Sequence, residues 1–192
     1  MIHTTIPIIL ASKSPRRKKL LKQIGLQFKS KSFDVDETFS PTESPVKLVK
    51  KLARTKLLAA TEKIKDSIII TADTIVVFDK KVLGKPKDKK DAARMLKKLS
   101  GNKHYVYTGF AIYNGITKKL IVDYEKTCVK FRTLSNDEID DYIATGSPMD
   151  KAGSYGIQDD YGAVFVSSIS GDYYNVVGLP LSKFYTRLIE VL

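Results

Sequence analysis

The stretch SIIITADTIVVF, residues 67–78, places a single carboxylate, Asp73, inside a run of mostly apolar and β-branched residues. Such a run predicts either one long bent strand or a pair of strands joined by a tight turn. A carboxylate inside a buried strand is costly unless it has a charged partner or a chemical role. Asp73 is therefore either a group that accepts a proton or binds a cation, or an ordinary turn residue of a hairpin.

Strand and helix patterns alternate along the rest of the chain, and Asn114-Gly115 between two β-rich runs marks a hairpin. Helix starts are marked by Ser44 before Pro45 and by Ser135, which can form a capping box with Glu138. The expected strands are 6–11, 67–78, both arms of 104–131 and 162–169; the expected helices are 15–24, 44–64, 88–101, 135–146 and one from about 180, with a long loop at 147–161. This order predicts a mixed α/β sheet, and 192 residues suit one domain.

The formal net charge of +12 favours anionic partners, among which phosphate is the commonest group. Most of the excess comes from lysines spread along the chain, so a solvated basic surface is the alternative explanation. Cys128 is the only cysteine, which excludes an intrachain disulfide and a thiolate metal cluster and favours a reducing cytoplasm. No apolar run approaches the roughly 18 residues of a membrane span.

The segment SKSPRR, residues 12–17, combines hydroxyl and guanidinium groups at an expected helix start. Ser14 before Pro15 marks the helix N-terminus, whose unpaired N–H groups and positive dipole end favour an anion. Ser12 can donate to a phosphate oxygen, and Arg16 or Arg17 can bind phosphate through two hydrogen bonds. The alternative is ordinary helix capping with two solvated arginines.

Two lysines have unusual local surroundings. Lys85 stands between a glycine and a proline in VLGKP, a constrained loop suited to presenting an ammonium group to phosphate. Lys56 falls on the mostly apolar face of helix 44–64. It is either a buried cation with a function or a side chain that runs along the apolar surface to solvent.

Further polar groups occur in two loops. The segment FDVDETF offers Asp34, Asp36 and Glu37, which together with Asp73 could supply the carboxylate oxygens that Mg²⁺ or Mn²⁺ prefers. Gln158 ends the glycine-rich segment DKAGSYGIQ, and its amide can read a base edge through one donor and one acceptor. The sequence thus offers phosphate-binding groups, cations, carboxylates and an amide that could recognise a base. Together these suggest a nucleoside triphosphate site.

Eight motifs follow one another along the chain: LASKSPRRKKLL, VDETF, ARTKLLAA, TADTIVV, LGKP, HYVYTGFAI, DKAGSYGIQ and GDYYNVVGLPL. In this order they resemble the Maf family of nucleotide pyrophosphatases, over essentially the whole chain. The resemblance implies one domain over residues 1–192, with a mixed, twisted sheet flanked by helices and a cleft between two lobes, as in Maf/ITPase-like folds. It also implies the branch that hydrolyses dTTP and UTP, or modified pyrimidine nucleotides, to the monophosphate and pyrophosphate with Mg²⁺, Mn²⁺ or Co²⁺.

The resemblance also assigns roles to individual positions. Asp73 matches the proton acceptor, and Glu37 and Asp73 match the carboxylates on the metal side. The positions that distinguish the pyrimidine branch from the 7-methyl-GTP branch read Arg16, Thr74 and Gln158, and the phosphate-binding positions read Ser12, Arg17, Lys56 and Lys85. After Gln158, where a glycine is expected, Asp159-Asp160-Tyr161 stands before Gly162, so this loop is longer and more acidic than the family pattern.

Two other functions fit parts of the sequence. The basic charge suggests a nucleic-acid-binding module, although the arginines are few and no recognised nucleic-acid motif is present. An inactive Maf-like scaffold with a role in cell division is the second, and the presence of Asp73, Lys56 and Lys85 argues against it. The resemblance further suggests a homodimer, and the expected partner is the nucleotide substrate. The single cysteine fits a cytoplasmic location, and neither a membrane nor a nucleic-acid partner is expected.

Overall fold

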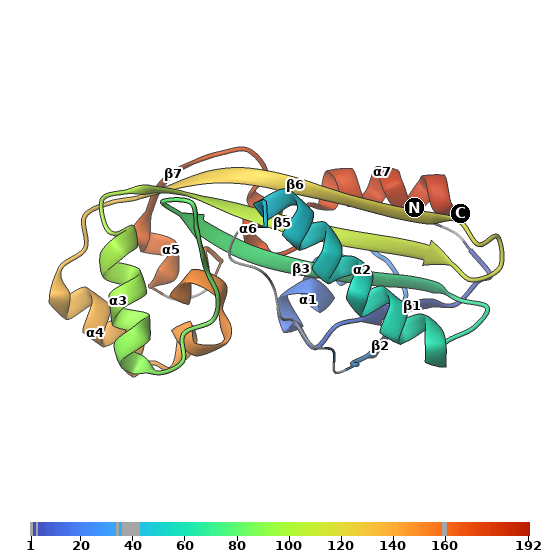
Figure 1. Ribbon diagram of the computed structural model, residues 1–192, viewed down its shortest axis with the longest axis horizontal. Helices are drawn as coiled ribbons and strands as arrows, with labels where there is room; N and C mark the ends of the chain where they lie inside the picture. The colour runs from blue at the N-terminus through green and yellow to red at the C-terminus, as the bar shows by residue number, and fades with distance from the viewer. Residues whose placement is uncertain (1, 3, 34, 36–42, 159–160) are drawn as a thin grey trace. The chain divides into compact units, whose positions relative to one another are not determined.

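The computed structural model describes the chain except for residues 1, 3, 34, 36–42 and 159–160 (Figure 1). The chain packs as two compact units. The first unit comprises Met1–Asp73, Thr108–Glu125 and Gly178–Leu192, and the second comprises Thr74–Tyr107 and Lys126–Val177. Helices and strands both contribute to each unit, and each unit has its own hydrophobic core.

The described strands form one mixed sheet in the order β2-β1-β3-β5-β6-β7, with β4 paired to β3. Their bounds are β1 Ile8–Ala11, β2 Lys29–Lys31, β3 Ile68–Phe78, β4 Lys81–Leu83, β5 Lys103–Asn114, β6 Leu120–Phe131 and β7 Val166–Ser170. β1 pairs in parallel with β2 and β3, whereas β4 and β7 pair antiparallel with β3 and β6. The predicted mixed α/β sheet is confirmed, and β5 and β6 are the expected hairpin arms.

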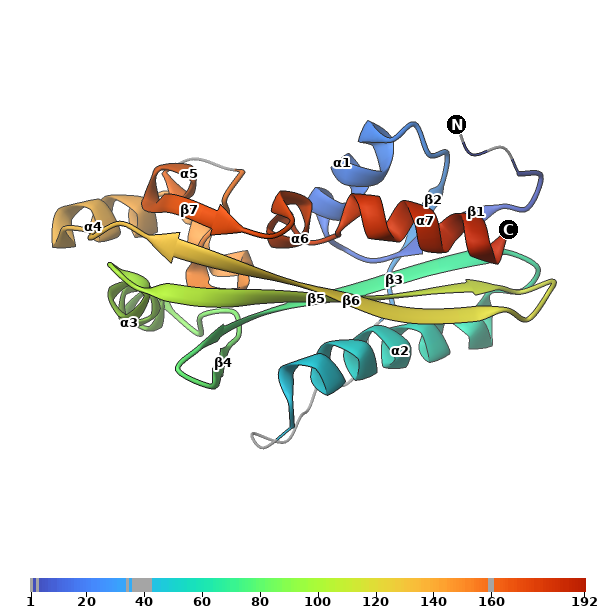
Figure 2. The same ribbon diagram turned by 90° about the horizontal axis from the view of Figure 1, so that it is seen from above.

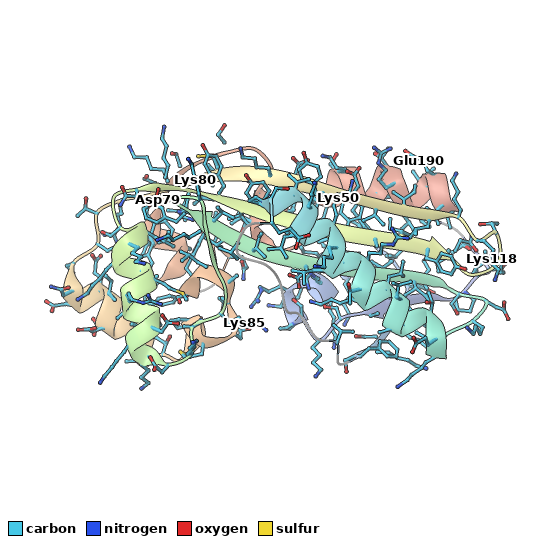
Figure 3. All side chains as sticks on the ribbon, in the orientation of Figure 1. Lys50, Asp79, Lys80, Lys85, Lys118 and Glu190 are labelled. Carbon is cyan, nitrogen blue, oxygen red and sulfur yellow. The ribbon has the colours of Figure 1, made fainter. Side chains whose placement is uncertain are left out.

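Residues 68–78 form one strand, β3, so the prediction of one long strand over 67–78 is right and that of two strands joined by a tight turn is wrong. Asp73 lies in the middle of β3, so the alternative of a turn aspartate in a tight hairpin is wrong. The hairpin turn comes later, at Asp79 and Lys80, where both residues adopt positive φ and β4 folds back on β3. Figure 3 labels these two residues at the end of the strand.

Three helices cover the strands of the first unit. They are α1 Pro15–Gln23, α2 Pro45–Lys63 and α7 Leu181–Val191, close to the bounds that the sequence predicts. Ser14 and Ser44 cap α1 and α2 by accepting hydrogen bonds from the backbone N–H groups of Arg17 and Lys47, as expected for serine before proline. Figure 2 shows α2 on one face of these strands and α1 and α7 on the other.

The second unit contains α3 Lys89–Leu99, α4 Asn136–Ala144, the 3₁₀ turns Ser147–Asp150 and Ala152–Ser154, and the short helices α5 Gly162–Phe165 and α6 Tyr173–Val177. The predicted capping box between Ser135 and Glu138 is present. The strand expected over 162–169 is wrong in its first half, because Gly162–Phe165 forms a helical turn and β7 begins at Val166. This turn places Phe165 in the core against Tyr142.

A polar pair is buried in the second unit. His104 Nε2 lies 2.8 Å from the hydroxyl of Tyr155, and both rings make edge contacts with Phe131. Burial away from water disfavours the charged imidazolium and lowers the pKa of His104 from 6.5 to about 4; burial also raises the pKa of Tyr155. His104 is therefore neutral in the folded protein at neutral pH.

We expect this histidine to weaken the fold in acid. Between pH 6.5 and 4 the unfolded chain binds a proton at His104 that the folded chain does not, so the free energy of unfolding falls as pH falls, by at most about 3 kcal/mol. Denaturant unfolding of the wild type and of His104→Gln, measured from pH 7.5 to 4, checks this expectation. The variant should lose less stability over the window; equal losses in the two proteins would contradict it.

Candidate active site

Two side-chain contacts join α2 to β3. Thr71 Oγ1 donates a 2.7 Å hydrogen bond to the carbonyl oxygen of Ala53, and Lys56 forms an ion pair with Asp73. Thr71 and Asp73 are two residues apart and point to the same face of the strand, while Ala53 and Lys56 are three apart on the same side of the helix. The two contacts therefore align residues about one helical turn apart on α2 with residues one two-residue repeat apart on β3, which fixes the position of the helix along the strand.

The ion pair lies largely out of solvent. The side chains of Lys56 and Asp73 are 18% and 14% exposed, so Lys56 does not extend along the helix into water. Asp73 and the following Thr74 are the only residues of β3 before Phe78 that are not fully buried. Asp73 is thus the one charged residue of this apolar strand; it is partly accessible to solvent, and Lys56 neutralises its charge.

Gly109 on β5 allows α2 to lie close to the sheet. A Cβ atom at this position would stand 2.3 Å from the carbonyl oxygen of Val49 and 2.9 Å from its Cβ atom. No side chain fits there, so the glycine sets the depth at which α2 and its Lys56 sit. Sequence reasoning missed Gly109 and Thr71 as positioning residues; a glycine within a β-rich run is the signal that could have indicated the close approach.

The residues of segment 12–17 come together at the start of α1. Ser12 Oγ accepts hydrogen bonds from the backbone N–H of Ser14 at 3.2 Å and from Arg17 Nη1 at 3.4 Å. Arg17 Nε donates to the carbonyl oxygen of Gly178 at 2.9 Å, which fixes the direction of the guanidinium group. Gly178 has φ +129°, a conformation that favours glycine, and no local sequence pattern indicates its contact with Arg17. Arg16 precedes Arg17 on the helix and is half-buried.

Three predicted site residues belong to the second unit. Thr74 follows Asp73 on β3 and is half-buried, and Lys85 is exposed in the loop after β4, where Figure 3 labels it. The carbonyl oxygen of Gly84 accepts a 3.0 Å hydrogen bond from the N–H of Gly153. This bond ties the Lys85 loop to the segment that leads to Gln158, which is also half-buried.

Of the two predicted metal carboxylates, Asp73 is among the described residues. Glu37 lies outside the described residues, as does Asp36, so the pairing of Glu37 with Asp73 stays a prediction. Among the residues that the structure describes, no group of three or more His, Cys, Asp or Glu side chains could hold a metal ion. One available carboxylate, Asp73, fits an ion such as Mg²⁺, which commonly uses one or two protein carboxylates together with substrate phosphates.

The described helices include none that is long and apolar enough to cross a membrane.

The fold and the candidate site together define a class of protein. It is an α/β protein whose mixed sheet carries a carboxylate–ammonium pair and whose first helix has serine and arginine groups at its N-terminus, which are groups suited to binding phosphate. The chain belongs to the Maf family, since a family profile described as Maf-like protein matches residues 7–191.

Relatives of known name match nearly the whole chain. The dTTP/UTP pyrophosphatase of Geobacillus sp. is 51% identical over 176 residues, covering 92% of this chain and 93% of its own. The dTTP/UTP pyrophosphatases of Clostridium botulinum (strain 657) and Dictyoglomus thermophilum are 50% and 49% identical over 188 and 182 residues, covering 96% and 94% of both chains. The resemblance stated from the motifs is thus confirmed at the level of the family.

We expect the Lys56–Asp73 pair to be energetically coupled. A double-mutant cycle with Lys56→Met and Asp73→Asn should give a coupling free energy of about 1 to 2 kcal/mol, because each single change leaves a polar or charged group largely buried beside the wrong partner. Chemical denaturation of the four proteins measures it.

The control is a second double-mutant cycle, on a more exposed ion pair at the start of the same helix. Lys51 is 54% exposed and pairs with Glu43 at 3.4 Å, so solvent screens this pair and its coupling should stay below about 0.5 kcal/mol. Equal couplings in the two cycles would contradict the view that burial makes the Lys56–Asp73 pair special.

Proposed function

We propose that this protein hydrolyses dTTP and UTP to the nucleoside monophosphate and pyrophosphate. Membership of the Maf family and the names of relatives about 50% identical over nearly the whole chain support this activity. The single structural observation that carries the proposal is the Lys56–Asp73 pair, which brings a carboxylate and a cation together on an otherwise apolar strand.

In the proposed reaction Asp73 accepts a proton from the attacking water as the water approaches the α-phosphorus. A carboxylate is competent for this step when it is ionised and held within hydrogen-bond reach of the water. Lys56 is proposed to contribute in two ways: its contact fixes the position of the carboxylate, and its positive charge would offset the negative charge that builds up on the phosphate oxygens. Catalysis of this kind depends mainly on positioning and on electrostatic stabilisation.

The phosphate groups are proposed to bind at the start of α1. The hydroxyl of Ser12, the guanidinium group of Arg17 and the positive dipole end of α1 favour the binding of phosphate oxygens. The Gly178 carbonyl holds Arg17 through Nε and Ser12 Oγ accepts a hydrogen bond from Nη1, so the guanidinium group is fixed beside the start of α1. The proposed task of Arg17 is to neutralise the pyrophosphate leaving group. The same role for Lys85 is a prediction of the family resemblance.

A divalent cation, Mg²⁺, Mn²⁺ or Co²⁺, is part of the proposal. Asp73, with Glu37 as the second predicted ligand, would hold it together with substrate oxygens. When bound, such an ion neutralises triphosphate charge and polarises the phosphoryl group. Homodimerisation stays a prediction of the resemblance, and a cytoplasmic location stays a prediction from the single cysteine.

Nucleotide choice is proposed to rest on Arg16, Thr74 and Gln158, the residue types of the pyrimidine branch. Arg17 then serves the phosphates, while its neighbour Arg16 serves substrate choice. The residues 159–161 that depart from the family pattern follow Gln158 directly and bear on the preference between dTTP and UTP. Residues 159 and 160 lie outside the described part of the chain.

We expect pyrophosphate release from dTTP and UTP, and little from ATP or 7-methyl-GTP, in a screen over nucleoside triphosphates with each of Mg²⁺, Mn²⁺ and Co²⁺. Chelation with EDTA should suppress the release. Absence of release from every nucleotide, together with binding of DNA or tRNA that weakens steeply with salt, would instead favour the nucleic-acid-binding alternative.

A further inference from the structure

Lys151, in the motif DKAGSYGIQ, is a buried cation that the proposed reaction does not use. It is 7% exposed, and it is the one charged residue among the fully buried side chains of the described chain. Its ammonium group donates to the carbonyl oxygen of Ser147 at 2.6 Å, to Ser147 Oγ at 3.2 Å and to Asp150 Oδ1 at 2.9 Å. An ammonium group has three donors, and here three acceptors satisfy them.

These contacts fix the course of the lysine side chain. A lysine normally lets its charged end move in solvent, but the Lys151 ammonium is bound to the backbone and side chain of the preceding 3₁₀ turn. Its carbon chain is held in place as a consequence. The partner carboxylate of Asp150 is 57% exposed, so the ammonium rather than the aspartate is the buried end of this ion pair.

The carbon chain of Lys151 lies directly against Gly156, and the Gln158 amide lies against the same glycine. A Cβ atom at Gly156 would stand 2.8 Å from Cε and 3.0 Å from Cδ of Lys151, and 3.2 Å from Nε2 of Gln158. The Gln158 amide therefore sits next to a surface made by the lysine methylenes and the bare Cα of the glycine. This contact lies wholly within the second unit.

The backbone of Gly156 is crowded as well, by Gly162. A Cβ atom at Gly162 would stand only 2.4 Å from the carbonyl oxygen of Gly156 and 3.1 Å from its nitrogen, so the two backbones are in close contact. The backbone at Gly156 cannot retreat in that direction. Any atom added to Gly156 must displace Lys151, which three hydrogen bonds hold, or the Gln158 amide, which is half-buried and easier to move.

We propose that Lys151 and Gly156 are positioning residues for substrate choice, because together they hold the Gln158 amide in the orientation that reads a pyrimidine base. This inference rests on the proposed function and on the assignment of Gln158 to base recognition. An amide reads a base edge only when its donor and acceptor face the matching groups, so a displaced amide loses discrimination among bases rather than phosphate binding.

Gly156→Ala is the direct test. Gly156 is absent from the residues with positive φ, so the added methyl group acts by contact and not through backbone strain. We expect kcat/KM for dTTP and UTP to fall roughly tenfold relative to GTP, the loss of about one well-aligned hydrogen bond. The ¹⁵N–¹H resonances of the Gln158 side-chain amide, assigned by their loss in Gln158→Glu, should shift in the same variant without any nucleotide.

A pair of second-site changes tests the role of Lys151. Lys151→Ala in the Gly156→Ala background removes the two carbon atoms that the new methyl group meets, and should restore most of the dTTP-to-GTP ratio. Lys151→Met keeps an unbranched chain of similar length and should not restore it. Rescue by alanine and not by methionine is the result that packing against the methylenes predicts.

Gly101→Ala is the matched control within the same unit. Its φ of +71° makes the substitution strained, while its only close neighbour would be Thr133 Oγ1 at 3.5 Å, so it costs stability without touching Gln158. Its activity should change equally for all nucleotides.

Equal changes for all nucleotides in Gly156→Ala, with unshifted Gln158 amide resonances and an active wild type, would overturn the inference. A wild type that releases no pyrophosphate from dTTP or UTP would instead refute the proposed function. The amide resonances would then still report whether Gly156 and Lys151 position Gln158.

Discussion

The ion pair between Lys56 and Asp73 is the interaction on which the rest of the candidate site depends. A carboxylate in the middle of β3 would destabilise the sheet if it stood alone, and Lys56, about one helical turn beyond the Thr71–Ala53 contact, supplies the cation that pairs with it. Gly109 lets the helix approach closely enough for both contacts to form. The distance of α2 from the sheet and the alignment of α2 with β3 thus both determine where the Lys56–Asp73 pair lies.

Lys56 and Lys151 both lie largely out of solvent, and they meet the cost of burial in different ways. Lys151 is satisfied by three acceptors of its own neighbourhood, which makes it rigid and suits it to supporting Gln158. Lys56 pairs with a carboxylate that remains partly accessible, which suits that carboxylate to chemistry with water and phosphate. Burial of an ammonium group therefore serves structure in one unit and the proposed reaction in the other. The guanidinium of Arg17, directed by the Gly178 carbonyl, is a third cation whose direction is fixed by a neutral acceptor.

Much of this arrangement can be predicted from the sequence because its signals are local. Serine before proline identifies the starts of α1 and α2, and an aspartate inside an apolar run marks Asp73 as a residue that needs an explanation. The rest depends on contacts between distant segments. Whether 67–78 is one strand or two is decided by pairing with β1 and β4, and the apolar run 162–169 begins as a helical turn because Gly162 packs on the backbone of Gly156. The Arg17–Gly178 contact joins residues 161 positions apart, and no local pattern announces it. The roles of Arg16 and Thr74 in substrate choice came from the family resemblance alone, whereas Lys85, Gln158 and Glu37 were also indicated by their local sequence.

The central claim is that Asp73 acts on water in the reaction and is not merely one half of a structural ion pair. The most direct test compares binding with turnover in Asp73→Asn, which keeps the shape of the side chain and removes its charge. The dissociation constant for an α,β-methylene analogue of dTTP should stay within about threefold of the wild-type value, while pyrophosphate release from dTTP should fall by roughly 10³-fold or more. Release that persists within tenfold of wild type, or a parallel loss of binding and turnover, would contradict the claim.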